Sequence, residues 1–149
     1  MADSIREQVV QAFDTLLQTI TTPTYETDAG SNVYGWRDTP LEQSQLPALV
    51  WRDTADVTPE TAAVDLHTLT VEVDCVVVKT TTVSAMAQMR KLIADVVKVL
   101  GTDLTLGGLA HDIFEVAEEV QVEHDGKKIL TATKTFEIHY TTNHFDPYN

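Results

Sequence analysis

Cysteine and cationic residues are scarce in this sequence of 149 residues. It contains one cysteine, Cys75, and ten lysines and arginines against 23 aspartates and glutamates. A single cysteine excludes an intramolecular disulfide. The net charge of −13 disfavours nucleic acid as a bound ligand, because phosphates are gathered by cations. Cys75 falls in the alternating series Val71, Val73, Cys75, Val77, which favours a small buried hydrophobic residue over a reactive thiol.

Long hydrophobic runs are also missing. No apolar run approaches the roughly 20 residues that cross a bilayer, and the first residues, MADSIREQVV, lack the basic and apolar regions of a secretory signal. We therefore expect no membrane association and a location inside the cell that makes the protein. With 43% hydrophobic and 22% charged residues, the composition is that of a globular protein, and the length predicts a single domain over residues 1–149.

Motifs for catalysis or metal binding are not found. The sequence has no GxSxG element, no Walker A loop and no histidine–cysteine spacing typical of zinc sites. His111 and Asp112 are adjacent, so on a strand they point to opposite faces. A group of carboxylates in residues 112–126 lacks the ladder of a calcium loop, which favours a solvated acidic face. Its members are Glu115, Glu118, Glu119, Glu123 and Asp125. We expect no catalytic residue, no cofactor, no metal and no enzymatic activity.

Two segments have the spacing of amphipathic helices. Ser4 followed by Glu7 has the form of a capping box, and the apolar residues behind it predict a helix over residues 4–20. The second helix is predicted over residues 82–100, with Gly101 as the residue that ends it.

Four strands are predicted, over residues 48–51, 66–79, 113–122 and 128–141. In the second strand apolar and polar residues alternate, so one of its faces is exposed to water. This strand would span about 46 Å, so we expect it to bend, bulge or project beyond its sheet. A hairpin turn is predicted at residues 124–126. The order αββαββ predicts an α+β fold, in which two helices lie on one face of an antiparallel or mixed four-stranded sheet.

A long polar segment, residues 21–45, separates the first helix from the first predicted strand. It is rich in Thr, Pro, Gly, Ser, Asp and Asn. Loops of this length are uncommon inside compact domains and are usually functional or disordered. We expect this segment to be mobile in an isolated subunit and to become ordered against a partner, because it has few apolar residues to offset its ordering entropy.

Aromatic and arginine side chains cluster in and after this segment. Tyr34, Trp36 and Arg37 lie within it, and Trp51 and Arg52 lie at the end of the next predicted strand. Trp, Tyr and Arg are the types that anchor protein interfaces, so these five residues are the candidate interface. The alternative, in which the rings fold back and cap their own core, remains open at this point.

In order, the chain has an amphipathic helix, a polar loop, the strand LPALVW, an alternating strand, a helix, the turn LGGLAHDI and the strand GKKILTATKTFEIHYTT, with a polar tail at 142–149. This sequence resembles the tail-terminator and tail-completion (minor tail) proteins of long-tailed double-stranded DNA bacteriophages. The resemblance covers nearly the whole chain. It rests on the order and size of elements rather than on a catalytic motif, so no residue role is carried over.

The resemblance implies an α+β subunit that assembles as a ring, typically a hexamer, at the head-proximal end of the tail tube. There it stops tube polymerisation and forms the surface for the head, leaving a channel through which DNA passes. Implied partners are further copies, the tail tube protein and a head connector or head-completion protein. The implied location is the virion, and the host cytoplasm during assembly. Six copies would carry a charge of −78, which must be offset at the contacts.

A second class of protein fits a similar order of elements. A ferredoxin-like regulatory domain that binds a small molecule and forms a homo-oligomer would need a concave pocket with a few convergent polar groups. The sequence alone does not locate such a pocket.

Overall fold

Two long antiparallel strands, β3 (Val64–Val78) and β5 (Ile129–Asn143), form the centre of the structure. A computed structural model describes residues 2–59, 63–121 and 128–149. β3 and β5 pair along their whole length, from Val64 opposite Asn143 to Val78 opposite Ile129. The predicted long alternating strand is therefore confirmed, and β5 supplies the backbone partner for all of it.

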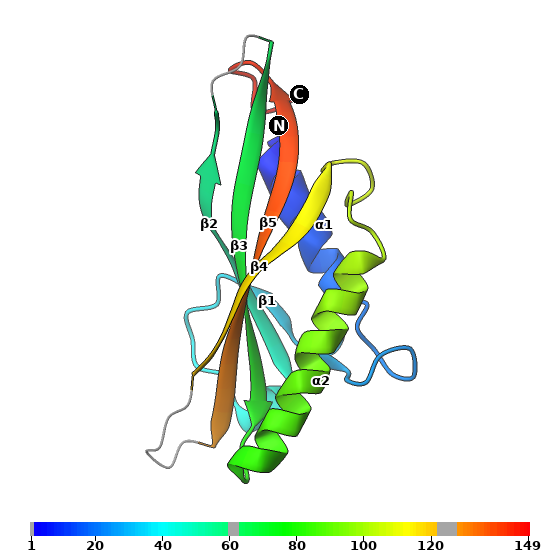
Figure 1. Cartoon of the computed structure of the whole chain (residues 1–149), viewed down its shortest axis with the longest axis vertical. Helices are drawn as coiled ribbons and strands as arrows, with labels where there is room; N and C mark the ends of the chain where they lie inside the picture. The colour runs from blue at the N-terminus through cyan, green and yellow to red at the C-terminus, as the bar shows by residue number, and fades with distance from the viewer. Residues whose placement is uncertain (1, 60–62, 122–127) are drawn as a thin grey trace.

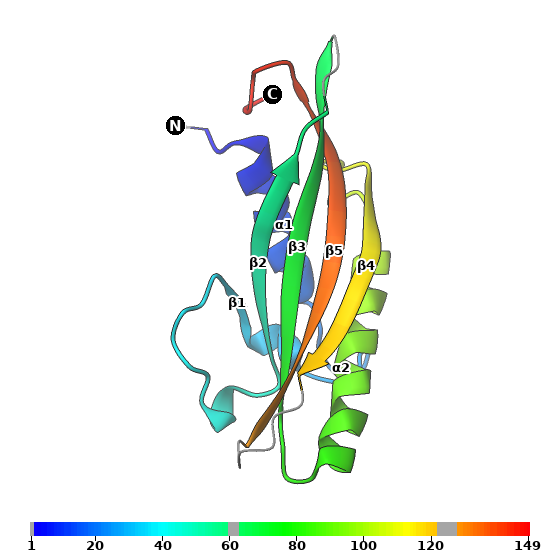
Figure 2. The same cartoon turned by 60° about the vertical axis from the view of Figure 1, so that its left-hand side comes forward.

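The sheet has five strands in the order β1-β2-β3-β5-β4. β2 (Ala48–Val57) and β4 (Asp112–Gln121) are antiparallel to their neighbours, whereas β1 (Val33–Gly35) is parallel to β2. Strands β2, β3, β5 and β4 follow one another across the sheet in Figure 2, and α1 passes behind them. The mixed α+β fold is confirmed. The prediction of four strands is wrong, because β1 has three residues within a polar segment and carries no periodic signal.

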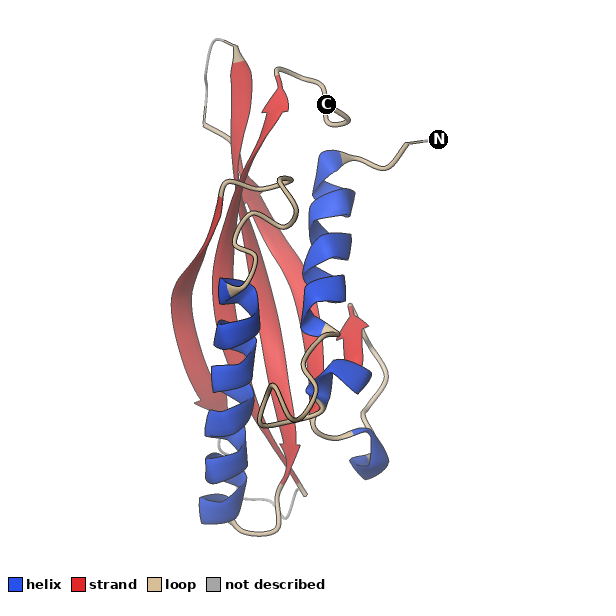
Figure 3. Cartoon of the chain, turned by 90° about the vertical axis from the view of Figure 1, so that its right-hand side faces the viewer, coloured by secondary structure: helices blue, strands red, loops and turns tan. Residues whose placement is uncertain are grey.

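Both helices, α1 (Ile5–Leu17) and α2 (Thr82–Gly101), lie side by side on one face of the sheet, as predicted (Figure 3). Each begins at a hydroxyl cap: Ser4 Oγ accepts a hydrogen bond from the Glu7 amide, and the side chain of Thr81 accepts one from the Ser84 amide. Gly101 does not end α2 as a left-handed residue. It is the last helical residue, and the left-handed positions come later, at Leu106, Gly107 and Gly108.

The hydrophobic core fills the space between the helices and the sheet. Phe13 of α1 meets Phe136 of β5 edge-on, with ring centres 6.4 Å apart. The inward residues of β3 are buried, which confirms the predicted alternation; they are Leu69, Val71, Val73, Cys75 and Val77. Burial raises the pKa of the Cys75 thiol to about 12, so this thiol stays protonated and unreactive at neutral pH, as the pattern predicts.

Two of the strands extend further than the sequence indicates. β2 does not stop at residue 51 but continues to Val57, with a bulge between Asp53 and Ala55. β5 reaches Asn143, and the residues after it fold back so that the Ile5 amide donates to the Pro147 carbonyl at 2.8 Å. Both chain ends therefore lie at the same end of the molecule (Figure 1). The turn predicted at 124–126 lies outside the described residues.

The polar segment 21–45 contains β1 and two short 3-10 turns, η1 (Ala29–Ser31) and η2 (Gln43–Gln45). Its first part is held by Asp95 of α2, which is only 2% exposed. The carboxylate of Asp95 accepts hydrogen bonds from the amides of Glu26 and Thr27 at 3.1 and 2.8 Å and from the Thr27 hydroxyl at 2.7 Å. Mobility of the whole segment in an isolated subunit stays a prediction.

Candidate functional site

A pocket of about 620 Å³ lies between α1 and the strands β1 and β2. We name it the Trp pocket, after the two indole rings in its wall. Its lining residues are Glu7, Val10, Gln11, Asp14, Thr15, Gly35, Trp36, Trp51 and Asp53. Three of the nine lining residues carry carboxylates and none is basic, so the pocket is both acidic and aromatic.

Two tryptophan–aspartate pairs build the wall of the Trp pocket. The indole N–H of Trp36 donates to Asp53 at 2.6 Å, and that of Trp51 donates to Asp14 of α1 at 2.7 Å. Trp51 is 8% exposed and belongs to the hydrophobic core, whereas Trp36 is 57% exposed. One ring therefore joins α1 to β2 from inside, and the other presents aromatic surface to solvent.

The backbone geometry around residue 35 fixes the positions of the Trp36 and Trp51 rings. Gly35 pairs with Trp51 across the parallel strands β1 and β2, and a Cβ at position 35 would overlap the six-membered ring of Trp51. Trp36 has a φ of +53°, the left-handed region that non-glycine residues seldom adopt. Such conformations persist only where the surroundings hold them. Here the Trp36 amide donates to the Trp51 carbonyl at 2.9 Å, and the indole is tied to Asp53.

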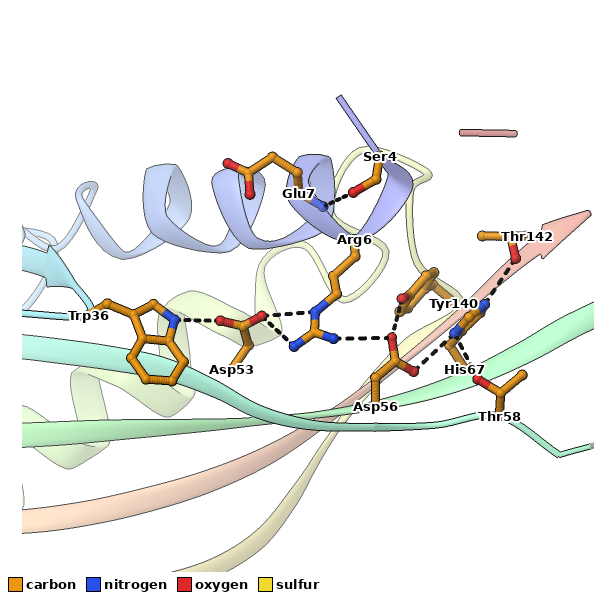
Figure 4. A network of polar contacts seen from close by, with 10 residues as sticks. All are labelled: Ser4, Arg6, Glu7, Trp36, Asp53, Asp56, Thr58, His67, Tyr140 and Thr142. Atoms are coloured by element: carbon orange, nitrogen blue, oxygen red, sulfur yellow. Dashed lines mark hydrogen bonds and ion pairs between the residues drawn. The ribbon is translucent and has the colours of Figure 1, made fainter. Parts of the chain in front are cut away.

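A polar network continues from the pocket along the amino-terminal end of α1 (Figure 4). Arg6 donates through Nε to Asp53 at 2.9 Å, and a second guanidinium nitrogen lies 2.8 Å from the same carboxylate. Another nitrogen of Arg6 lies 3.9 Å from Asp56. The guanidinium therefore links two aspartates of β2 to the first turn of the helix.

The far end of the network joins β2 to β3 and β5. Asp56 accepts a hydrogen bond from the Tyr140 hydroxyl at 2.5 Å, and its other oxygen lies 3.0 Å from His67 Nδ1. His67 Nε2 lies 2.9 Å from the Thr142 hydroxyl (Figure 4). The rings of His67 and Tyr140 stack with centres 4.4 Å apart. Burial, with help from Asp56, raises the pKa of Tyr140, so the phenol remains a hydrogen-bond donor.

The structure brings Trp36 and Trp51 together in one pocket but not the other three predicted interface residues. The Arg37 guanidinium lies 4.4 Å from the centre of the Tyr34 ring, and its Nε donates to the Thr39 carbonyl at 3.1 Å. These two side chains therefore stabilise their own loop.

Arg52 lies on the other face of the sheet from Trp51, because adjacent residues of a strand point to opposite sides. Its guanidinium lies 2.6 Å from Asp74 and 3.0 Å from Glu72 on β3. The hydrogen bond to Asp74 is the largest cause of a raised pKa for Arg52. The five residues do not form one continuous surface, and an interface role for each stays a prediction.

Sequence reasoning missed the network residues Arg6, Asp53, Asp56, His67 and Tyr140. They come from four separate elements. The strand register brings the residues of β2, β3 and β5 together, and the packing of α1 on the sheet adds Arg6. The acidic stretch on β4 also has a partner that local sequence did not indicate. Lys134 of β5 lies 3.8 Å from Glu115 and 3.6 Å from Glu118, while Glu123 and Asp125 lie outside the described residues.

Within residues 2–59, 63–121 and 128–149, no group of three or more His, Cys, Asp or Glu side chains is placed to hold a metal ion. In the same described part of the chain, no helix is both long and apolar enough to span a membrane.

Comparison with known proteins gives a weak structural likeness. No family model matches the chain, and no curated protein matches it. Among solved structures, one match is a chain from the virion of a native gene transfer agent particle, with 14% sequence identity and a TM-score of 0.48. It covers 93% of this chain and 92% of that one. A likeness at this level carries no argument about function.

Proposed function

We propose that this protein is a structural component of a bacteriophage virion. In this proposal it assembles as a ring, typically a hexamer, at the head-proximal end of a tail tube, ends tube polymerisation and forms the surface to which the head joins. Its partners are further copies of itself, the tail tube protein and a head connector or head-completion protein. DNA only passes through the channel. The proposal assigns the protein no catalytic role and no cofactor.

The order and size of the elements in the sequence support this proposal through the resemblance to tail-terminator proteins. The single structural observation that carries it is the placement of Trp36. A large aromatic ring that is 57% exposed, tied to Asp53 and held by a left-handed backbone, has the properties of an interface anchor. Such a ring is ordered before a partner arrives, so binding loses less conformational entropy.

The test is the assembly state of the purified full chain. We expect negative-stain images to show rings with a central hole, and light scattering to give a mass of about six subunits. Added to polymerising tail tube protein, the rings should cap the tubes and limit their length. Monomers or compact dimers at all concentrations tested would overturn the proposal.

A second candidate is the small-molecule-binding regulatory domain, and the observation that favours it is the Trp pocket. Its volume of about 620 Å³ lies within the range of ligand sites. β3, α2 and β4 also form a split βαβ unit around β5, a feature of ferredoxin-like folds. Since the lining carboxylates favour a cation, calorimetry with small organic cations tests this candidate. Saturable binding to a dimer would support it over the ring.

A further inference from the structure

The outward face of α2 is positively charged, in a protein with a net charge of −13. Arg90, Lys91 and Lys98 are exposed on this helix, whereas Asp95 is buried on its inner side. The rest of this outward strip is small or apolar and consists of Val83, Ala87 and Ala94, of which Val83 is 83% exposed. We name these six residues the α2 basic face. From Val83 to Lys98 it extends about 22 Å along the helix.

The two central cations of the α2 basic face are not used within the subunit. Other cations do make contacts within the subunit. Arg52 pairs with carboxylates of β3, and Lys98 donates to the Thr24 carbonyl at 2.8 Å. Arg90 and Lys91 make no hydrogen bond or ion pair within the residues that the structure describes. Two such cations beside an exposed valine form a surface that complements an acidic, partly apolar partner.

The Trp pocket offers that complement. Asp53 already pairs with Arg6, but Glu7 and Asp14 have no cationic partner among the described residues. Trp36 adds an exposed ring, and indole is the aromatic system that attracts Arg or Lys most strongly. A long cationic side chain would find carboxylates and an aromatic face in one pocket. The volume of about 620 Å³ leaves room for it.

The two surfaces belong to different elements of the subunit and share no residue. In Figure 3, α1 lies beside β1 on one side of the molecule, and α2 lies on the other. The pocket residues Glu7, Gln11 and Asp14 recur at helical spacing on α1, next to β1 and β2. Two different surfaces that meet between copies of one subunit make a head-to-tail contact, and such contacts generate closed rings or open filaments.

We propose that the α2 basic face of one copy docks against the Trp pocket of the next copy, with Arg90 or Lys91 entering the pocket. The occupant is a second copy of this chain, and the inference rests on the ring of the proposed function. The contact places two cations that the described part of the subunit does not use against carboxylates that lack a cationic partner there. It thereby offsets the repulsion between subunits that each carry −13.

The first experiment reverses the charge of the α2 basic face at its two central cations, with the double variant Arg90→Glu/Lys91→Glu. We expect the apparent association constant to fall by roughly 30-fold or more, as for loss of a partner from an interfacial charge pair. Sedimentation velocity measures the association, and circular dichroism confirms that the monomer folds. The control is Lys128→Glu, an exposed cation just before β5 that is not part of the α2 basic face, which should leave the assembly unchanged.

The second experiment makes the edge of the Trp pocket positively charged, with the double variant Glu7→Lys/Gln11→Lys. Both side chains are exposed, so the fold should persist while self-association is lost. The matched control is Glu119→Lys/Gln121→Lys, the same two changes on exposed positions of β4. Mixing the two association-deficient variants should restore assemblies in which they alternate, since each reversed surface then meets its opposite.

The outcomes separate the two proposals. If the unaltered protein forms no ring, the proposed function fails. If it forms rings and the Arg90→Glu/Lys91→Glu variant forms them equally well, this inference is overturned and the ring stands. If that variant is deficient but mixing restores nothing, the Trp pocket is not the surface that receives α2. If the Arg90→Glu/Lys91→Glu variant still forms rings but these no longer join tail tubes, the α2 basic face binds another virion protein and not a second copy of this chain.

Discussion

The tetrapeptide Trp-Arg-Asp-Thr occurs twice in the chain, at residues 36–39 and at residues 51–54. The first copy follows β1 in a loop, and the second lies within β2. The two copies lie next to each other, since the Trp36 amide donates to the Trp51 carbonyl. One tryptophan is largely exposed and the other is buried. Identical local sequence thus has opposite roles, because strand pairing rather than the residues themselves decides which ring faces the helices.

The aspartates and arginines of the two copies differ in the same way. Asp53 accepts hydrogen bonds from Trp36 and Arg6, while Asp38 makes no hydrogen bond or ion pair within the described part of the chain. Arg52 bridges two carboxylates on the sheet, and Arg37 contacts its own loop. The copy on β2 therefore contributes to the fold, and the copy in the loop is left available for a partner.

The largest expected difference lies between the two tryptophans. Trp51→Ala removes a core aromatic and should lower the free energy of unfolding by about 3–5 kcal/mol. Trp36→Ala should lower it by less than about 1 kcal/mol, because most of the ring is exposed, but it should weaken self-association. Urea unfolding of the monomers and sedimentation of the assembled protein measure the two effects. A loss of several kcal/mol for Trp36→Ala would show that its ring is core rather than an anchor.

The close approach of the two copies depends on Gly35. Gly35→Ala places a methyl group into the ring of Trp51, so either the ring or β1 must move. We expect a loss of about 1–3 kcal/mol, typical of overpacking, together with a changed Trp51 fluorescence. Gly101→Ala is the control, because a Cβ there meets nothing within 4 Å. Unchanged stability of Gly35→Ala would mean that β1 is not held against β2.

Replacing Asp53 and Asp38 tests whether the two Trp-Arg-Asp-Thr segments differ in their contribution to stability. Asp53→Asn keeps an acceptor for the Trp36 indole but removes the charge that faces Arg6. We expect a loss of about 1–2 kcal/mol, toward the lower end for a hydrogen bond to a charged group, because the Arg6 side chain is partly exposed. Asp38→Asn should change the stability by less than about 0.5 kcal/mol. Thermal unfolding at matched pH measures both, and equal effects of the two changes would contradict the comparison.

The smallest difference should lie between the arginines. Arg52→Gln removes two partly exposed ion pairs and leaves Glu72 beside Asp74, which should cost about 0.5–1 kcal/mol. Arg37→Gln should have almost no effect on the monomer. The Arg52 pairs are partly exposed to ions in solution, so the cost should shrink as salt rises from about 0.05 to 0.5 M. Over this range the Debye length falls from roughly 14 Å to roughly 4 Å. A cost independent of salt would indicate that packing of the Arg52 stem dominates.

Most elements that the sequence predicted have a local period. The exception is β4, predicted over residues 113–122 from the turn before it and found at Asp112–Gln121. α1, α2, β3 and β5 each carry an apolar repeat of 3.6 or 2 over many residues, and each was found close to its predicted bounds. β1 and the outer half of β2 carry none, because their residues gain strand structure by pairing with a neighbour. Such pairing joins residues that are far apart in the chain, so no short segment of the sequence indicates it.

The Trp pocket was only half predictable for the same reason. Residue type singled out Trp36 and Trp51, since tryptophan is one of the types that anchor protein interfaces. Nothing local indicated that Asp14 of α1 and Asp53 of β2 would receive their indole N–H groups, because both pairings depend on where α1 crosses the sheet. Arg52 was grouped with Trp51 by adjacency, yet the alternation of a strand places it on the opposite face.

The enclosed Cys75 also makes the protein a convenient scaffold for chemical labelling. A thiol that is buried and has a raised pKa does not compete for maleimide reagents or oxidants in the folded subunit. A cysteine introduced at position 11 or position 90 would then be the reactive one, with no background mutation required. In the proposed ring, a disulfide between position 11 of one copy and position 90 of the next would show that these two positions come within bonding distance.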